Sequence, residues 1–296
     1  MTGVRAGWPL VLVALACSAP VEDVPVTALA TFNVQMFFDT VCDSESCNGQ
    51  DDFERAPTQA QFDAHVDELA AAIRKLDADV VTLQEVENQA SLDALHVRLA
   101  DIYPVAVLGE TGGDASIDVA TLSRGELEEV ATHLDRPLMT ENGGITYFKR
   151  ALLETHLRID GRPTIVFNAH FKSKFNDQPA QRLAEASGAR AIVLERTAEF
   201  PDALILLAGD LNDTPGSAPL ETLEIGGDLR RVTGELGSDA GTIVFGGSYR
   251  AIDHIYHSTA GAGAFVVGSA SVHRDGRGLA NSDHAALRAE FTRSDP

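Results

Sequence analysis

The residues of this sequence that are best suited to chemistry follow directly after apolar runs. One of these places carries several side chains with oxygen atoms. The apolar run 204–208 leads directly into Gly209 and Asp210, with Asn212 two residues later. In a strand, Asp210 and Asn212 project to the same side, and Gly209 lets the backbone turn closely. Their side-chain oxygens suit a hard cation such as Mg²⁺ or Ca²⁺. The structural alternative is an Asx turn that starts a helix after Pro215.

Two more oxygen-bearing side chains follow apolar runs nearer the N-terminus. Asn33 closes the run 28–32, and Glu85 follows the run 80–83, which is apolar apart from Thr82. A carboxylate in such a place pairs with a cation, binds a metal or lies at an exposed rim. Taken alone, each of the two also fits an ordinary surface residue.

A histidine with two lysines beside it follows the apolar run 164–167. The three residues are His170, Lys172 and Lys174. A single histidine after a strand also fits a hydrogen-bonded structural residue. The two lysines favour an anionic ligand, because an ammonium group is a common partner of phosphate.

Two Asp-His pairs stand in the last sixth of the chain, Asp253 with His254 and Asp283 with His284. Adjacent residues of a strand face opposite ways, so both members of one pair cannot point into one cleft. We therefore expect cross-pairing, in which the aspartate of one pair orients the histidine of the other. An imidazole held by a carboxylate is a competent general acid or base.

Strands and helices of the expected kinds connect these clusters. Apolar runs of strand length lie at 28–34, 80–83, 119–122, 164–169, 204–208, 252–256 and 285–291. Helical patterns lie at 62–76, 92–99 and 181–196. Because the two types do not alternate strictly, a mixed sheet or two packed sheets is favoured over a barrel.

The charge balance limits the partners of the protein. The 296 residues carry 44 Asp and Glu against 23 Lys and Arg, a net charge of -21. Broad binding to a phosphate polymer usually rests on Lys and Arg contacts, so this composition argues against it. It does not exclude a nuclease, because a bound cation reverses the charge of one cleft. Solubility is the other explanation for the excess of acids.

The N-terminus is typical of an export signal. Arg5 precedes the apolar run 10–16, which is too short to span a bilayer, and Cys17 follows. Residues 14–16 fit a cleavage site, and with Cys17 they resemble a lipoprotein box whose cysteine carries lipid. A buried N-terminal strand is the alternative. We expect an export signal at 1–17, a tether at 18–26 and a single catalytic domain at 27–296. The protein is then an outer-membrane lipoprotein, periplasmic or extracellular.

The remaining cysteines agree with export. Cys42 and Cys47 stand close together in a polar segment, where an oxidising compartment lets them form a disulfide. A metal-binding pair is the alternative, but no second pair of Cys or His stands at zinc-site spacing.

In their order from Asn33 to His284, the clusters resemble the endonuclease/exonuclease/phosphatase superfamily, which has the deoxyribonuclease-I-like fold. The matching elements are the strand Asn, Leu-Gln-Glu-Val at 83–86, the strand-end His, Gly-Asp-Leu-Asn at 209–212, the first Asp-His pair and the terminal Ser-Asp-His at 282–284. The segment 117–124 is similar to the central strand of the family. His-Phe-Lys-Ser-Lys at 170–174 looks most like the branch of secreted bacterial nucleases. The resemblance implies a four-layer α/β sandwich, two packed mixed β-sheets flanked by helices.

The resemblance also implies a metal site and a cofactor. Glu85 would be the principal metal ligand, with Asn33 beside it, and Asp283 would lie near the metal or the leaving group. The implied cofactor is a divalent cation, Mg²⁺ first, with Mn²⁺ and Ca²⁺ as alternatives.

The other implied roles concern the substrate. Asp210 and Asn212 would orient the attacking water and the phosphate, and His170 would contact the scissile phosphate, with Lys172 beside it. Asp253 would hold His284. Strand alternation then points His254 away from the cleft.

Together these features predict a divalent-metal-dependent phosphoesterase, an exported nuclease that acts as a monomer on nucleic acid. The alternative is a phosphatase or phosphodiesterase acting on lipid, inositol or nucleotide substrates. A binding module without catalysis is the third interpretation, and the complete set of site residues argues against it. The lysines favour nucleic acid, the net charge opposes it, and we expect no exposed apolar hairpin for entering a membrane. Lipid on Cys17 would anchor the protein to a membrane.

Overall fold

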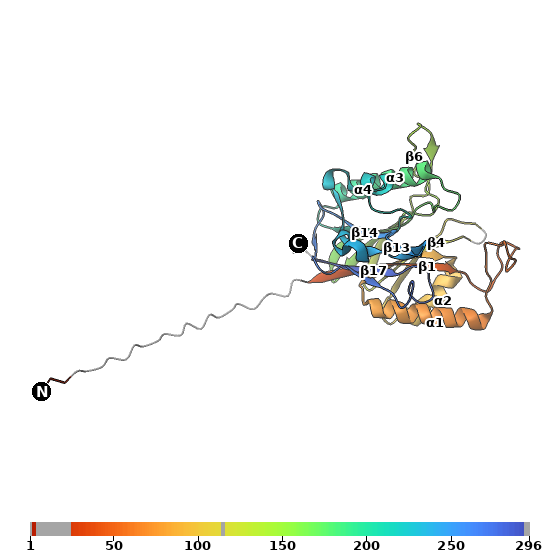
Figure 1. Cartoon of the computed structure of the whole chain (residues 1–296), viewed down its shortest axis with the longest axis horizontal. Helices are drawn as coiled ribbons and strands as arrows, with labels where there is room; N and C mark the ends of the chain where they lie inside the picture. The colour runs from red at the N-terminus through yellow and green to blue at the C-terminus, as the bar shows by residue number, and fades with distance from the viewer. Residues whose placement is uncertain (1, 4–24, 114–115, 293–296) are drawn as a thin grey trace.

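A computed structural model describes residues 2–3, 25–113 and 116–292, and two β-sheets dominate it (Figure 1). The expected export signal with Cys17 and most of the expected tether lie outside the described residues. In the described part of the chain, no helix has the length and apolar character needed to cross a membrane.

The first sheet is built around a parallel pair, β1 and β2. Its strand order is β15-β17-β1-β2-β4-β3, with β16 also pairing with β17. The bounds are β1 Val26–Phe37, β2 Val80–Val86, β3 Val105–Gly109, β4 Asp118–Ser123, β15 Ala264–Phe265, β16 Ser271–His273 and β17 Ala286–Thr292. All neighbours other than β1 and β2 run antiparallel.

The second sheet has the same plan around the parallel pair β9 and β10. Its order is β11-β14-β10-β9-β8-β5. The bounds are β5 Glu126–Ala131, β8 Leu153–Ile159, β9 Arg162–His170, β10 Leu204–Asp210, β11 Leu229–Arg231 and β14 Asp253–Ser258. The remaining neighbours are antiparallel.

The two sheets pack face to face, and helices cover their outer faces. Side chains such as Leu29, Leu206 and Leu287 are buried between the sheets. Helices α1 (Gln59–Leu76) and α2 (Gln89–Leu99) pack on the first sheet, and α3 (Pro179–Glu199) and α4 (Ala218–Glu224) pack on the second. This arrangement confirms the expected four-layer α/β sandwich.

Every expected strand and helix is present, and the structure adds elements that the sequence patterns did not show. These are β3, β5, β8, β11, β15, β16, α4, the hairpins β6 (Leu138–Met139) with β7 (Ile145–Thr146) and β12 (Ile243–Phe245) with β13 (Ser248–Arg250), and the 3₁₀ segments η1 (Ile225–Gly227) and η2 (Val232–Ala240). Strand β5 is exposed along most of its length, so it carries no apolar pattern.

The expectation of no exposed apolar hairpin was wrong, because two hairpins expose apolar side chains. The β6–β7 hairpin leaves Met139 63% and Ile145 64% exposed, and the β12–β13 hairpin leaves Phe245 76% exposed.

A buried carboxylate ties α3 to the second sheet. Glu154 of β8 is 1% exposed and accepts hydrogen bonds from His133 Nε2 (2.6 Å), His156 Nε2 (2.5 Å) and Arg196 Nε (2.7 Å). Burial alone would raise the pKa of Glu154, but these three donors outweigh it and lower the pKa to about 2. The carboxylate is therefore charged in the folded protein over the whole physiological range.

We expect this cluster to stabilise the fold in a pH-dependent way. Because the folded pKa of about 2 lies below the unfolded value of 4.5, the stabilisation is complete above 4.5 and is lost as the pH falls towards 2. Glu154→Gln should lower the free energy of unfolding at neutral pH by about 3 kcal/mol, and the gap to the native protein should narrow below pH ~4.5. Urea titrations at several pH values measure it, with the exposed Glu141→Gln as control. An equal gap at pH 7 and pH 3 would contradict the assignment.

Candidate active site

The register of the strands explains why residues distant in sequence meet at one edge of the sandwich. In the second sheet, Asp210 at the end of β10 lies opposite both His170 at the end of β9 and Asp253 at the start of β14. β14 is antiparallel to β10, so its start lies beside the end of β10. His284, just before antiparallel β17, reaches the same edge from the first sheet, where β1 and β2 end.

Two amide side chains join the sheets directly behind this edge. Gln84 of β2 donates from Nε2 to Oδ1 of Asn168 in β9 (2.8 Å). Asn168 in turn donates to the backbone carbonyls of Leu83 (2.9 Å) and Ala120 (2.8 Å). All of these groups are buried. These bonds hold β2 and β9 in one alignment, and thereby the residues at their ends.

Two carboxylates converge on the amide of Asn33. Asn33 Nδ2 lies 3.1 Å from Glu85 Oε1 and 3.1 Å from Asp210 Oδ2, one carboxylate from each sheet. The other oxygen of Glu85 accepts the backbone N–H of Met36 (2.8 Å). Glu85 has a φ of 67°, and the pairing of β2 shifts register there. This local irregularity turns Glu85 towards the site and out of the strand alternation.

His170 stands over the two carboxylates as a neutral imidazole. Its Nε2 is 3.7 Å from Asp210 Oδ2 and 3.9 Å from Glu85 Oε1. Burial, reinforced by the positive charges of Arg150 and His284, holds the pKa of His170 well below its usual value. His170 can therefore donate one N–H to a ligand without bringing a positive charge.

The other histidine of the site has the opposite charge state. His284 Nδ1 lies 2.8 Å from Asp253 Oδ2, and both side chains are buried. Burial lowers the pKa of His284, but the charge and hydrogen bond of Asp253 outweigh it and raise the pKa to about 10. His284 Nε2 points towards Asp210 Oδ2 at 3.9 Å. The structure thus forms the expected cross-pair and supplies a charged donor.

The remaining members of the two Asp-His pairs lie elsewhere. His254 is buried with Nε2 3.0 Å from the carbonyl oxygen of Asp213, behind β14 and away from the cleft, as strand alternation predicts. Asp283 lies at the mouth of the site, with its side chain 51% exposed and Oδ1 3.9 Å from His284 Nε2. Its backbone N–H donates to Gln35 Oε1.

Asn212 and Lys172 line the cleft but have structural contacts as well. Asn212 donates its backbone N–H to Asp210 Oδ1 (2.8 Å) and its Nδ2 to the carbonyl of Phe171 (3.1 Å). The Lys172 ammonium donates to the carbonyls of Ser173 (2.9 Å) and Phe175 (2.6 Å), so it holds the loop that follows β9.

Lys174 forms an ion pair with Asp213 (2.8 Å) at the outer edge of the loop.

Sequence reasoning missed two cations that line the cleft, Lys149 and Arg150, of which the less exposed is Arg150. It lines the cleft beside His170 and Asp210, and the carboxylates of Glu85, Glu185 and Asp210 oppose the lowering of its pKa by burial. Arg150 lies just before β8, which runs antiparallel to β9. Because no sequence pattern predicted β8, no signal in the sequence pointed to Arg150.

The cleft formed by these residues has a volume of about 740 Å³, which suits a small ligand or one segment of a polymer.

The sequence pattern of the Endonuclease/Exonuclease/phosphatase family matches residues 30–284. The chain belongs to this family. No curated protein sequence matches the chain.

Solved structures share the fold of this family member at low sequence identity. TDP2 from Caenorhabditis elegans superposes with a TM-score of 0.64 at 19% identity, covering 93% of this chain and 77% of that one. D. rerio TDP2 complexed with single strand DNA product gives 0.60 at 17%, covering 90% and 99%. Sphingomyelinase C from Streptomyces griseocarneus gives 0.60 at 20%, covering 90% and 99%. At such identities the likeness establishes the fold.

The donor set of this endonuclease/exonuclease/phosphatase chain fits a divalent cation. Burial raises the pKa of Asp210 well above its usual value, and the charges of Asp253 and Glu85, which raise it further, place an excess of negative charge beside Asp210. A hard cation relieves such an excess. Glu85 would hold it, with Asp210 close by, whereas Asn33 turns its amide nitrogen to both carboxylates and its Oδ1 to the backbone of Gln35. Asn33 and Asp283 as metal ligands stay predictions.

Asp210, Asp253 and His284 also lie close enough together to suggest a metal site. The hydrogen bond between Asp253 and His284, beside Asp210, explains this group better.

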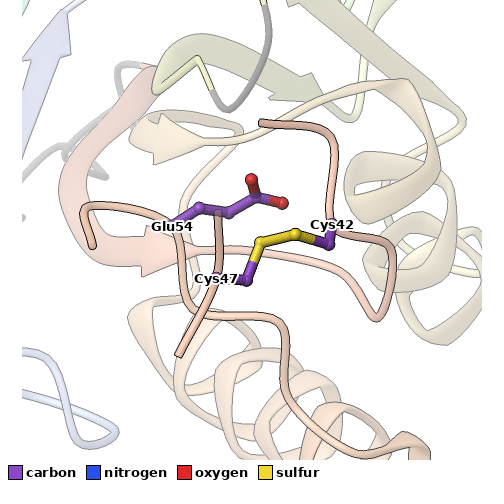
Figure 2. A group of neighbouring side chains, drawn as sticks. All are labelled: Cys42, Cys47 and Glu54. Atoms are coloured by element: carbon purple, nitrogen blue, oxygen red, sulfur yellow. A yellow bond between two sulfur atoms is a disulfide. The ribbon is translucent and has the colours of Figure 1, made fainter. Parts of the chain in front are cut away.

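The expected disulfide between Cys42 and Cys47 is present, in the loop that follows β1 (Figure 2). Glu54 lies beside it and accepts the backbone N–H groups of Asp43 and Ser44, each at 2.7 Å. Phe53, the neighbour of Glu54, lines the active-site cleft. The disulfide therefore replaces the alternative metal pair and shapes one rim of the site.

Gly209 is required by the close approach of β9 and β10 under the site. Its φ is 143°, and a Cβ there would lie 1.9 Å from the carbonyl oxygen of Ala169. We expect Gly209→Ala to lower the free energy of unfolding by about 3 kcal/mol or more, from strain and overpacking together. Gly276→Ala is the control, because nothing lies within 4 Å of its Cβ position. Urea melts of both variants measure the difference, and equal midpoints would contradict the argument.

Proposed function

We propose that this protein is a divalent-metal-dependent phosphodiesterase, and that nucleic acid is its substrate. The observation that supports this most is the convergence of Glu85, Asp210 and His170 with the His284–Asp253 pair in one cleft. Carboxylates for a cation stand there beside donors for phosphate oxygens. That combination suits in-line attack of water on a phosphoester.

Each side chain has a role that follows from its charge state. The Asp210 carboxylate, fixed by the Asn212 N–H at 2.8 Å, orients the attacking water and receives its proton. The neutral His170 and the charged His284 donate to phosphoryl oxygens, where negative charge develops. A cation held at Glu85, when bound, neutralises part of the same charge.

A cationic rim favours an extended substrate over a free phosphate monoester. Lys149, Arg150 and Lys172 line the cleft in an otherwise acidic protein of net charge -21. They form a local positive strip for phosphates next to the scissile one. A protein of similar fold, D. rerio TDP2, was solved complexed with single strand DNA product.

The proposal extends to location: the protein acts after export. The apolar run 10–16 before Cys17 supports this, and so does the Cys42–Cys47 disulfide, which suits an oxidising compartment. Lipid on Cys17 would anchor the domain. Mass spectrometry of the mature N-terminus, on protein exported by a bacterial host, distinguishes lipidation of Cys17 from simple cleavage of the signal.

One experiment tests the activity. The purified protein is incubated with plasmid DNA, RNA, bis-p-nitrophenyl phosphate, a mononucleotide and sphingomyelin vesicles, each with Mg²⁺ and with a chelator. We expect cleavage of nucleic acid and of the generic diester, abolished by the chelator. Cleavage of sphingomyelin alone would replace nucleic acid with a lipid substrate, and no cleavage of any diester would overturn the proposal.

A further inference from the structure

A second pocket adjoins the catalytic cleft. Its volume is about 410 Å³, and the two cavities share Phe175, Asn212 and Ile243 among their lining residues. Because Asn212 is hydrogen-bonded to Asp210 and borders both cavities, a group in the second pocket lies next to the reacting phosphate. The pocket is therefore placed for the part of the substrate adjacent to the scissile bond.

Two exposed phenylalanines stand at this pocket. Phe175 is 80% exposed and Phe245 is 76% exposed. They belong to different segments, the loop after β9 and strand β12. The Phe175 loop is held in place by the Lys172 ammonium, which donates to the Phe175 carbonyl at 2.6 Å. Exposed aromatic rings that converge on one pocket usually mark a binding site.

Polar and cationic groups complete the lining. Thr214, Ser173 and Asn212 bring hydroxyl and amide groups, and Arg250 stands on the neighbouring strand β13. In the described residues the Arg250 guanidinium has no ion pair, whereas Lys174 is neutralised by Asp213. The pocket thus combines flat apolar faces, hydrogen-bonding groups and one free positive charge.

We propose that this pocket is a nucleobase subsite: the base next to the scissile phosphate stacks on Phe175 and Phe245, and Arg250 contacts the following phosphate. The proposal rests on the proposed function and names the part of the substrate that this pocket recognises. A base uses all three properties of the pocket, since its faces stack and its edges form hydrogen bonds. An acyl chain would leave the Thr214 hydroxyl and the Asn212 Oδ1 without partners.

The experiment compares two single-stranded oligonucleotides of equal length, one with bases and one in which every base is replaced by an abasic analogue. The native protein is measured beside Phe175→Ala, Phe245→Ala and the double variant. Because both rings are exposed, these changes should leave the melting temperature unaltered. Val97→Ala, on α2 and 72% exposed, is the control for loss of an exposed apolar side chain elsewhere.

We expect kcat/KM on the base-containing strand to fall roughly 10- to 100-fold in each single variant, the worth of one stacked base. On the abasic strand the native protein should already have a low kcat/KM, and the phenylalanine variants should have the same kcat/KM as the native protein. Arg250→Gln should weaken cleavage of both strands, since both carry phosphates.

The subsite would be overturned if the phenylalanine variants lost kcat/KM equally on both strands, or lost it on neither. A vesicle test would overturn it as well. If the native protein binds vesicles of equal phosphatidylcholine and sphingomyelin and the double variant does not, the two rings serve a lipid surface. Cleavage of bis-p-nitrophenyl phosphate separates failure of the subsite proposal from failure of the proposed function. If the native protein cleaves neither this diester nor the oligonucleotides, the phosphodiesterase itself is wrong.

Discussion

Asp253→Asn is expected to lower kcat by about four orders of magnitude without unfolding the protein. Asp253 Oδ2 accepts Nδ1 of His284 at 2.8 Å and is the main reason that the pKa of His284 rises to about 10. An asparagine cannot stabilise the imidazolium and can fix the wrong tautomer. In a hydrolase triad of different chemistry the same change costs ~10⁴ in rate. Steady-state kinetics with a thermal melt of each protein measures the effect.

His254 supplies the matched control for Asp253. It is the next residue of the same strand and is equally buried, yet its Nε2 meets the carbonyl of Asp213 behind the sheet. We expect His254→Ala to cost stability and little turnover. If the folded His254→Ala protein is as inactive as Asp253→Asn, the wrong member of the pair has been assigned to the phosphate.

Glu85→Gln is expected to act through the cation. The Glu85 carboxylate stands at the centre of the acidic group, 3.1 Å from the Asn33 amide and 3.9 Å from His170. Losing a hydrogen-bond partner of a metal ligand typically costs 10–100-fold in metal affinity, so losing the principal ligand should cost more than about 100-fold. Raised Mg²⁺ or Mn²⁺ should then recover part of the activity. Activity against metal concentration, with calorimetric titration of Mg²⁺ alone, measures both effects.

Glu87→Gln is the control for Glu85. Glu87 is a buried carboxyl only two residues later, but it faces the disulfide loop, where it accepts the Asp39 N–H at 2.6 Å. Its removal should leave the Mg²⁺ dependence unchanged. A larger change of Mg²⁺ affinity in Glu87→Gln than in Glu85→Gln would place the cation on the other side of the loop.

The main features of the fold and site were readable from local patterns. Strand β10 is an unbroken apolar run that ends in Gly209 and Asp210, and burial of that run between a sheet and α3 makes the pattern visible. The stripe of α1 is visible for the same reason. The Asp253–His284 pair followed from strand alternation and the family resemblance, because alternation alone excludes a pairing inside either Asp-His dipeptide.

Tertiary structure alone decided the features that depend on which strands are neighbours. Arg150 joins the site because β8 runs antiparallel to β9, and no local sequence pattern shows the direction in which one strand runs beside another. Gln84 and Asn168 stand in motifs that pointed to chemistry, yet they hold the two sheets together, since each finds its partner across the interface.

The second pocket is a further example. Phe175 and Phe245 are 70 residues apart in sequence and line one pocket only because β9 and β14 flank β10 and bring the segments beside them to one edge. The sequence by itself therefore determined which residue types end the buried strands, and with them the chemistry that is available. The packing of one sheet against the other decided which of those residues face one phosphate, because that choice depends on contacts between segments far apart in the chain.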